Sequence, residues 1–452
     1  MKLIPLSRKF LFWLLGFTLS ASSFIGCKCV KSTLQGPENP KPFSVNFLLN
    51  SYVSDADIKA RLIDAVDEAG GTIAADSIVI RRCPCDSTLI NITLPNSYTI
   101  EGQGPLAVKP GGGGGAASGG IDLPVQKGSV GFNYTIDVFE PTDPKISRPA
   151  SLSPLNVYIS QQNKDAGKTV AVAVFDSGLD ESYLPELNRK HTVNLCNIAG
   201  IPSNTSEKGW NFVGGSGGFS DTGDNNIGKH GSGVAHLVVR QSNSSPTIVK
   251  IVPMKVLGAD NKGDVFGLMC AMETARRNNI PIFNMSLGYY GEPDSLLRQY
   301  IKKATDQGIW IVTAAGNKPQ NESPDSTRNL ANMQKKFYPA SFSEFDRVLA
   351  VSTAHLNSSV LSACIGQNYS PSLVLGVVPN FVATVDSCRF VLENSSVSVV
   401  GTSFASPILA GWLATQINQP GGLQNRSTVI GAMTQATGGT TLYQNKYIQA
   451  VP

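Results

Sequence analysis

Short apolar runs alternate with amphipathic stretches over the C-terminal two thirds of the chain. From about residue 156 the runs TVAVAVFD, TIVKIVPMKVL, IPIFNMSLG and IWIVTAAGN are separated by GSGVAHLVVR, FGLMCAMETARRNN and LLRQYIKKATDQG. The runs are apolar throughout rather than alternating, which indicates strands buried on both faces. The pattern predicts an α/β domain over residues 156–452, a doubly wound and mainly parallel sheet covered by helices.

A different pattern precedes this domain. Residues 43–105 contain the strand-like runs SVNFLL, DSIVIRR and TLINITL and one helical stretch, DADIKARLIDAVDEA, which starts at Asp and stops at two glycines. They predict a small α+β domain. The run VKPGGGGGAASGG then marks a linker, so residues 106–155 are expected to be a Gly-rich linker and lead-in.

The first residues have the composition of an export signal. A positively charged start precedes an apolar run from Phe10 to Leu19, which predicts a signal peptide over residues 1–26. The following FIGC resembles the bacterial lipoprotein cleavage box, with Phe in place of the usual Leu. This resemblance implies a lipid on Cys27, a tether over residues 27–42 and an exported, membrane-anchored bacterial protein. The alternative is ordinary cleavage, with Cys27 a bystander.

Charge and cysteine usage narrow the possibilities. The net charge of +4 over 452 residues is too small to indicate a nucleic-acid partner. The spacing of the eight cysteines and four histidines matches no metal site. Cys364 and Cys388 lie near each other in sequence, and export permits a disulfide there. Cys270 falls in an apolar helical pattern and is expected in the core.

Polar residues with catalytic chemistry follow the predicted strands. Asp176 ends one strand, His230 precedes a helix, Asn317 follows another strand, and Ser403 starts an apolar helix. In doubly wound sheets the site lies at the carboxyl ends of the strands. A serine hydroxyl needs an adjacent base, and that base needs an orienting acid. Each residue alone has an ordinary explanation as a turn or cap residue, whereas all four in this order indicate a catalytic set.

The motifs of this set closely resemble those of the subtilisin-like serine proteases. GTSFASP matches the family's nucleophile motif, and KVLGAD, MSLG, AAGN and FYPAS match in order from about Val170 to Ala414. The order Asp, His, Ser is also that of the family. The resemblance implies a secreted serine endopeptidase acting on proteins or peptides as a monomer, with no cofactor required for catalysis. An esterase is disfavoured because GTSFA is not GxSxG.

The resemblance also implies a role for each residue. Ser403 would attack the scissile carbonyl, His230 would act as general base, and Asp176 would orient the imidazole. The oxyanion hole would combine the backbone N–H of Ser403 with the side-chain amide of Asn317.

By the same resemblance, the substrate adds as an extended strand between two backbone edges. The matching edges are Ser286-Leu287-Gly288 and Gly263-Asp264-Val265. Ala314-Ala315-Gly316 would complete the primary pocket, with Phe337 on its floor. Because Phe337 is bulky, we expect a shallow pocket that favours small or medium side chains before the scissile bond.

Three questions stay open at this stage. The family usually has HGTHVAG at its histidine, whereas this chain has HGSGVAH, so the alternative is a catalytically weak or inactive subtilisin-fold surface binding protein. Residues 43–105 resemble a family propeptide in size and class, or form a permanent spacer. Calcium often stabilises the family, and Asp221, Asp224 and Asn225 offer oxygen ligands, but such a cluster is usually a polar turn.

Overall fold

The computed structural model describes most of the two predicted domains. The described residues are 44–68, 71–95, 123, 125–139, 165–180, 193–194, 206–207, 209–213, 221–243, 245–319, 328–379, 388–393, 397–417, 419 and 421–451. The predicted signal peptide, tether and lipidation site Cys27 lie outside them, as do His191 and most of the Gly-rich stretch. Within these residues, no helix combines the length and apolar character needed to cross a membrane.

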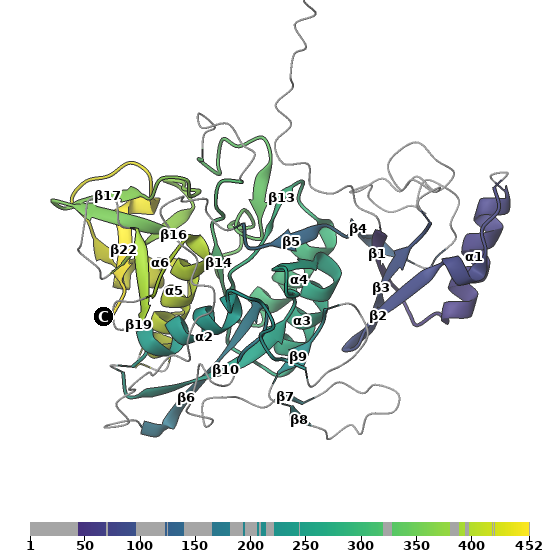
Figure 1. The fold of residues 1–452 in the computed structure, drawn as a ribbon, viewed down its shortest axis with the longest axis horizontal. Helices are drawn as coiled ribbons and strands as arrows, with labels where there is room; N and C mark the ends of the chain where they lie inside the picture. Colours follow the sequence, from purple (N-terminus) through teal and green to yellow (C-terminus); the bar gives the residue numbers. More distant parts are fainter. Residues whose placement is uncertain are drawn as a thin grey trace, which may run out of the picture. The chain divides into compact units, whose positions relative to one another are not determined.

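A ten-stranded sheet forms the centre of the larger domain (Figure 1). Neighbouring strands from β22 to β9 are all parallel, while β21 and β17 pair antiparallel at β22 and β16. This confirms the predicted doubly wound α/β architecture. The strand order is β21 (Thr434–Gln435), β22 (Lys446–Gln449), β18 (Val374–Val378), β16 (Val348–Asn357), β14 (Trp310–Ala314), β12 (Ile282–Met285), β6 (Asp165–Asp176), β10 (Thr247–Lys255) and β9 (Trp210–Asn211), with β17 (Val360–Ala363) beside β16.

Helices cover both faces of this sheet, and β6 shows why its sequence is apolar throughout. Val172 and Val174 belong to the core cluster that contains α2 (His230–Gln241) and α5 (Thr402–Ile417). The alternate residues Ala173 and Phe175 belong to the cluster of α3 (Val265–Arg277) and α4 (Ser295–Asp306) on the other face. Successive side chains of a strand point to opposite faces, so both sets must be apolar. The short helix α6 (Arg426–Ala432) follows α5.

The N-terminal region is a four-stranded antiparallel sheet with one helix. Its order is β2 (Val79–Cys83), β3 (Asp86–Thr93), β1 (Ser44–Leu49) and β4 (Val125–Phe132). Helix α1 (Asp55–Glu68) follows the predicted bounds closely, and it packs on the sheet through Ile58, Leu62 and Val66. The 3-10 turn η1 (Ala75–Ser77) connects it to β2.

The fourth strand differs from the sequence prediction, because β4 lies inside the stretch expected to be linker and lead-in. Gly128 and Gly131 weaken its strand signal, since glycine is a poor strand former. Packing requires the glycine at 131: a Cβ there would lie 2.2 Å from a carboxylate oxygen of Asp294. The small domain therefore takes an edge strand from beyond the glycine run.

Short paired strands complete the described chain. β5 (Thr135–Asp137) pairs with β11 (Lys262–Asp264), and β13 (Tyr289–Gly291) pairs with β15 (Lys336–Tyr338). The other short elements are the pairs β19 (Arg389–Glu393) with β20 (Val397–Val400) and β7 (Val193–Asn194) with β8 (Ser206–Glu207), and the turn η4 (Tyr443–Asn445).

Candidate active site

Asp176 and His230 form a buried pair at the carboxyl end of the sheet. Asp176 is the last residue of β6 and His230 the first of α2. His230 Nδ1 lies 2.8 Å from Asp176 Oδ1, and the backbone N–H of Ser177 donates to the same oxygen at 2.8 Å. The aspartate is fully buried and the imidazole nearly so. The carboxylate therefore fixes the ring orientation and can stabilise a positive charge on it.

Ser403 enters the same site from the N-terminus of α5. Gly401 precedes the helix with φ +120°, a backbone conformation that residues other than glycine rarely adopt. Ser403 is the second residue of α5. The His230 ring lies 5.0 Å between centroids from Phe404, the neighbour of Ser403. The helix N-terminus brings a partial positive charge to the position where an oxyanion would form.

Ser286 holds the start of α5 from behind. Its hydroxyl donates to the carbonyl oxygen of Ser403 at 2.7 Å and lies 2.9 Å from the hydroxyl of Ser406. Asn284 Nδ2 donates to the Ser286 hydroxyl at 3.0 Å. The predicted edge residue Ser286 thus contributes its buried side chain to positioning the nucleophile, a role that the sequence alone did not indicate.

Asn317 connects β14 to the nucleophile helix. Its Oδ1 accepts from the backbone N–H of Thr402 at 3.0 Å, and Thr402 Oγ1 accepts from the N–H of Gly316 at 3.0 Å. Tyr290 donates its hydroxyl to the Asn317 carbonyl at 2.7 Å. With Oδ1 engaged, Nδ2 is directed as a donor beside Ser403, as an oxyanion hole requires.

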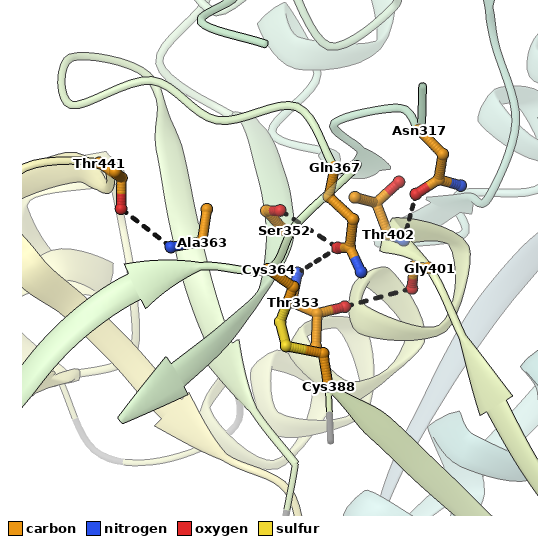
Figure 2. Close-up of a disulfide and its surroundings, with 10 residues drawn as sticks. All are labelled: Asn317, Ser352, Thr353, Ala363, Cys364, Gln367, Cys388, Gly401, Thr402 and Thr441. Atoms are coloured by element: carbon orange, nitrogen blue, oxygen red, sulfur yellow. Dashed lines mark hydrogen bonds between the residues drawn. A yellow bond between two sulfur atoms is a disulfide. The ribbon is translucent and has the colours of Figure 1, made fainter. Parts of the chain in front are cut away.

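A disulfide stands behind this arrangement (Figure 2). Cys364 and Cys388 are joined, which confirms that the two residues are suited to a disulfide. Gln367 Oε1 accepts from the backbone N–H of Thr353 at 3.0 Å, and Thr353 Oγ1 donates to the carbonyl of Gly401 at 3.3 Å. The disulfide therefore links the loop that contains Gln367, which pairs with Asn317, to the β19–β20 hairpin that precedes Ser403.

Asp224 is the centre of a second buried network. It accepts from Ser177 Oγ at 2.9 Å and from both the N–H and the hydroxyl of Ser232, at 2.9 and 2.8 Å. Burial raises the pKa of the Asp224 carboxyl above its usual range. Since Ser177 Oγ also donates to Asp176 at 3.3 Å, the network supports the Asp176 carboxylate, and Ser232 contributes its hydroxyl to it.

The same network uses the oxygens considered for calcium. Asn225 Oδ1 accepts from Lys255 Nζ at 3.2 Å, while Asp224 is engaged with serines. Among the described side chains, no three His, Cys, Asp or Glu are grouped so that they could hold a metal ion.

The unusual HGSGVAH motif has a packing explanation. Gly233 lies under β19 and α5, where a Cβ would meet Leu392 at 3.4 Å and Phe404 at 3.7 Å. His236 is buried one turn later, and burial, with the charge of Arg240, lowers its pKa to about 4. Gly233 lies against Phe404, whose ring also contacts His230, and the Asp176–His230 hydrogen bond of 2.8 Å is present beside both of these departures.

The predicted substrate edges hold a segment of the chain itself. Residues 135–137 pair antiparallel with β11, so that Ile136 opposes Gly263. On the other side, Asp137 and Gly288 exchange two backbone hydrogen bonds of 2.9 and 3.0 Å. Val265 donates its N–H to the carbonyl of Tyr134 at 3.0 Å. The two edges thus form a slot that takes an extended strand.

The end of this segment reaches the catalytic residues. Ser403 Oγ donates to the carbonyl of Val138 at 3.4 Å, and Asn317 Nδ2 donates to the carbonyl of Phe139 at 2.9 Å. The Phe139 ring packs edge-on against Tyr290 and Phe337, at 5.2 and 5.8 Å between centroids. The segment therefore occupies the cleft as a bound peptide would.

Phe337 fills the inner part of the expected primary pocket. A Cβ on Gly288 would lie 2.4 Å from the ring, and one on Gly316 would lie 2.7 Å from it, so the ring sits between these two backbones. Leu287, Ala314 and Ala315 are buried around the pocket. The ring of Phe139 packs edge-on against Phe337, so an aromatic side chain lies where the sequence predicted a preference for small or medium ones.

Comparisons with known proteins agree with this geometry. The sequence profile of the Subtilase family, Peptidase_S8, matches residues 167–446. Subtilisin of Bacillus pumilus is 28% identical over 273 residues, which is 59% of this chain and 82% of that protein. Subtilisin amylosacchariticus of Bacillus subtilis subsp. amylosacchariticus is 27% identical over 273 residues, and the match spans 60% of its length. The alkaline protease of Shouchella clausii is 27% identical over 191 residues, 41% of this chain and 44% of that protein.

Proposed function

The chain belongs to the subtilase family, and from this premise we propose that it is a serine endopeptidase that hydrolyses peptide bonds through an acyl-enzyme on Ser403. The observation that carries the proposal is the Asp176–His230 pair at 2.8 Å, set beside the α5 N-terminus that bears Ser403. The family implies a serine peptidase, and the geometry of these residues supports activity in this chain.

In the proposed reaction, His230 Nε2 accepts the Ser403 proton as Oγ attacks the scissile carbonyl. The imidazole then gives that proton to the leaving amine, and water later attacks the acyl-enzyme by the same route. Asp176 stays ionised and holds Nδ1–H throughout. Asn317 Nδ2 and the Ser403 N–H stabilise the oxyanion. Each such donor typically lowers the activation free energy by about 3–4 kcal/mol.

We further infer that the N-terminal region acts as a propeptide rather than as a permanent spacer. The observations that support it are the strand at residues 135–137 between both cleft edges and the Phe139 carbonyl at the Asn317 amide. A peptide placed this way offers the bond after Phe139 to Ser403. Until that bond is cut and the segment leaves, the cleft excludes other substrates.

For the N-terminus we propose export by a signal peptide over residues 1–26 and lipidation of Cys27. The proposal rests on the sequence pattern alone. Metabolic labelling with a fatty acid tests it: incorporation that is lost in Cys27→Ala supports the anchor, and equal incorporation in both proteins contradicts it.

Labelling with a fluorophosphonate tests the proposed chemistry, because this reagent reacts only with an activated serine. Wild type is expected to label once the N-terminal region has been removed by limited proteolysis, and Ser403→Ala is not. The matched control Ser406→Ala, which alters a neighbouring buried hydroxyl, is expected to label. A folded wild type that fails to label after removal of residues 1–139 would favour the alternative of a surface binding protein.

A further inference from the structure

The β2–β3 hairpin of the N-terminal sheet is anchored on α3 and α4 by polar contacts. Arg81 forms an ion pair with Asp264 at 2.5 Å, and its guanidinium lies 4.8 Å above the ring of Phe266. Tyr300 donates its hydroxyl to Asp86 at 2.9 Å. These contacts fix the hairpin against two helices of the large domain.

Two free cysteines face each other at this contact. Cys83 ends β2 and Cys270 lies within α3, and each is 1% exposed. Both belong to the same buried cluster where α3 contacts β2, and burial, together with interaction with Cys83, raises the pKa of the Cys270 thiol, although 187 positions separate the two residues in the chain. The apolar pattern around Cys270 predicted a core residue, and it is one, but the sequence did not reveal its partner.

The surroundings fit a covalent link. The chain already contains the Cys364–Cys388 disulfide, so thiol oxidation is compatible with its proposed export. A disulfide requires the two sulfurs to lie about 2 Å apart, and both side chains are buried in the same cluster. Burial raises the pKa of the Cys270 thiol, so little thiolate is available once the hairpin has docked, and oxidation must come earlier, while the thiols are accessible.

We propose that Cys83 and Cys270 form a disulfide in the exported protein and so cross-link the N-terminal sheet to the peptidase domain. One thiolate attacks a protein disulfide or oxidised glutathione and releases one thiol of that donor. The second thiolate then displaces the other donor thiol. The two cysteines lose two protons and two electrons, and the donor disulfide is reduced to two thiols.

The consequence rests on the proposed function. After the bond following Phe139 is cut, the N-terminal fragment would remain attached to the peptidase domain through Cys83–Cys270. Departure of the inhibitory segment would then depend on reduction of this bond as well as on cleavage. A lipid on Cys27 would likewise stay connected to the protease.

Thiol mapping tests the proposal in a form that needs no protease activity. The full-length Ser403→Ala protein is exported, unfolded in the presence of an alkylating reagent without reductant, and digested for peptide mass analysis. Neither Cys83 nor Cys270 is expected to be alkylated, and a linked peptide pair should appear that reductant abolishes. Alkylation of both cysteines in most of the protein would overturn the proposal.

Cleavage of the same protein between residues 110 and 120, by a specific protease at an inserted site, gives the second readout. Because Cys85 also forms a disulfide, the experiment uses a Cys85→Ser background: on a non-reducing gel the two fragments are expected to migrate together, and to separate after reduction or when Cys83→Ser is added. The double variant Cys364→Ser with Cys388→Ser should still migrate as one species. Separation without reductant would contradict the cross-link, whereas failure of wild-type protein to cut itself would contradict only the proposed function.

Discussion

At the scale of single residues, Asn317 illustrates how one side chain serves both structure and chemistry. Its Oδ1 secures the first turn of α5 through Thr402, and its Nδ2 donates to the carbonyl of Phe139, the residue after the Val138 that Ser403 contacts. The two atoms can be separated by mutation, because an aspartate retains the acceptor and loses the donor.

We expect Asn317→Asp and Asn317→Ala to lower kcat by at least about 10²-fold with little change in KM, because the lost donor acts mainly on the oxyanion. In protein from which residues 1–139 have been removed, only Asn317→Ala should also lower the melting temperature, since it alone loses the bond to Thr402. Steady-state kinetics with a peptide substrate and thermal unfolding give the two readouts. A change confined to KM would show that Asn317 binds the ground state instead.

The sequence singled out Asp176, His230, Asn317 and Ser403 as candidates because each lies in a local motif at a strand or helix end. It could not identify the hydroxyl of Ser286 as a support for α5. That role depends on contacts across more than a hundred residues, for which no local pattern exists. The occupant of the cleft was missed for the same reason.

At the scale of elements, the β19–β20 hairpin contacts α2, which begins at His230, and leads directly into α5, which carries Ser403. Leu392 lies over Gly233 of α2, and the hairpin continues into Gly401 at the start of α5. The histidine motif and the hairpin are therefore adjusted to each other. This packing accounts for Gly233, one of the three positions of α2 at which HGSGVAH differs from the family pattern, while His230 is retained.

His236 should make the fold sensitive to acid. Its pKa is lowered to about 4 in the folded protein, against the usual 6.5, so its contribution to stability is complete above about pH 6.5 and is lost as the pH falls to about 4. The loss is on the order of 3 kcal/mol. Burial raises the pKa of Asp294 to about 6, so its contribution to stability increases as the pH falls through this range. This contribution is the same in wild type and in a variant at His236, so it cancels in their comparison.

Denaturant unfolding of wild type and His236→Leu at several pH values between 4 and 7 isolates this contribution. The free energy of unfolding of the variant should rise relative to wild type as the pH is lowered. Parallel curves over the whole range would mean that His236 is not buried in its neutral form.

The Cys364–Cys388 bond should stabilise the fold and the approach to Ser403. It closes a loop with a sequence separation of 24, and such a loop corresponds to about 3 kcal/mol. The double variant Cys364→Ser with Cys388→Ser is expected to melt several degrees lower, measured by thermal unfolding. Addition of a reductant should lower the melting temperature of wild type by more than that of the variant, which retains the other disulfides; an equal decrease in both proteins would argue against a contribution from the Cys364–Cys388 bond.

At the scale of the whole molecule, the segment that follows β4 of the N-terminal sheet runs between β11 and Gly288, along the two predicted substrate edges of the peptidase domain. The parallel sheet was predictable because its strands are apolar throughout, whereas β4 was not, because Gly128 and Gly131 interrupt its pattern. The boundary therefore moved: residues expected to form a linker instead carry an edge strand and the segment that fills the cleft.

The central claim, that Ser403 works with His230 and Asp176 on a segment held in the cleft, is tested most directly by N-terminal sequencing of the purified exported protein. Wild type is expected to yield a peptidase fragment that begins at Glu140, while Ser403→Ala remains uncut at that bond. A wild-type chain that stays intact, or one cut at the same bond in Ser403→Ala, would contradict the account.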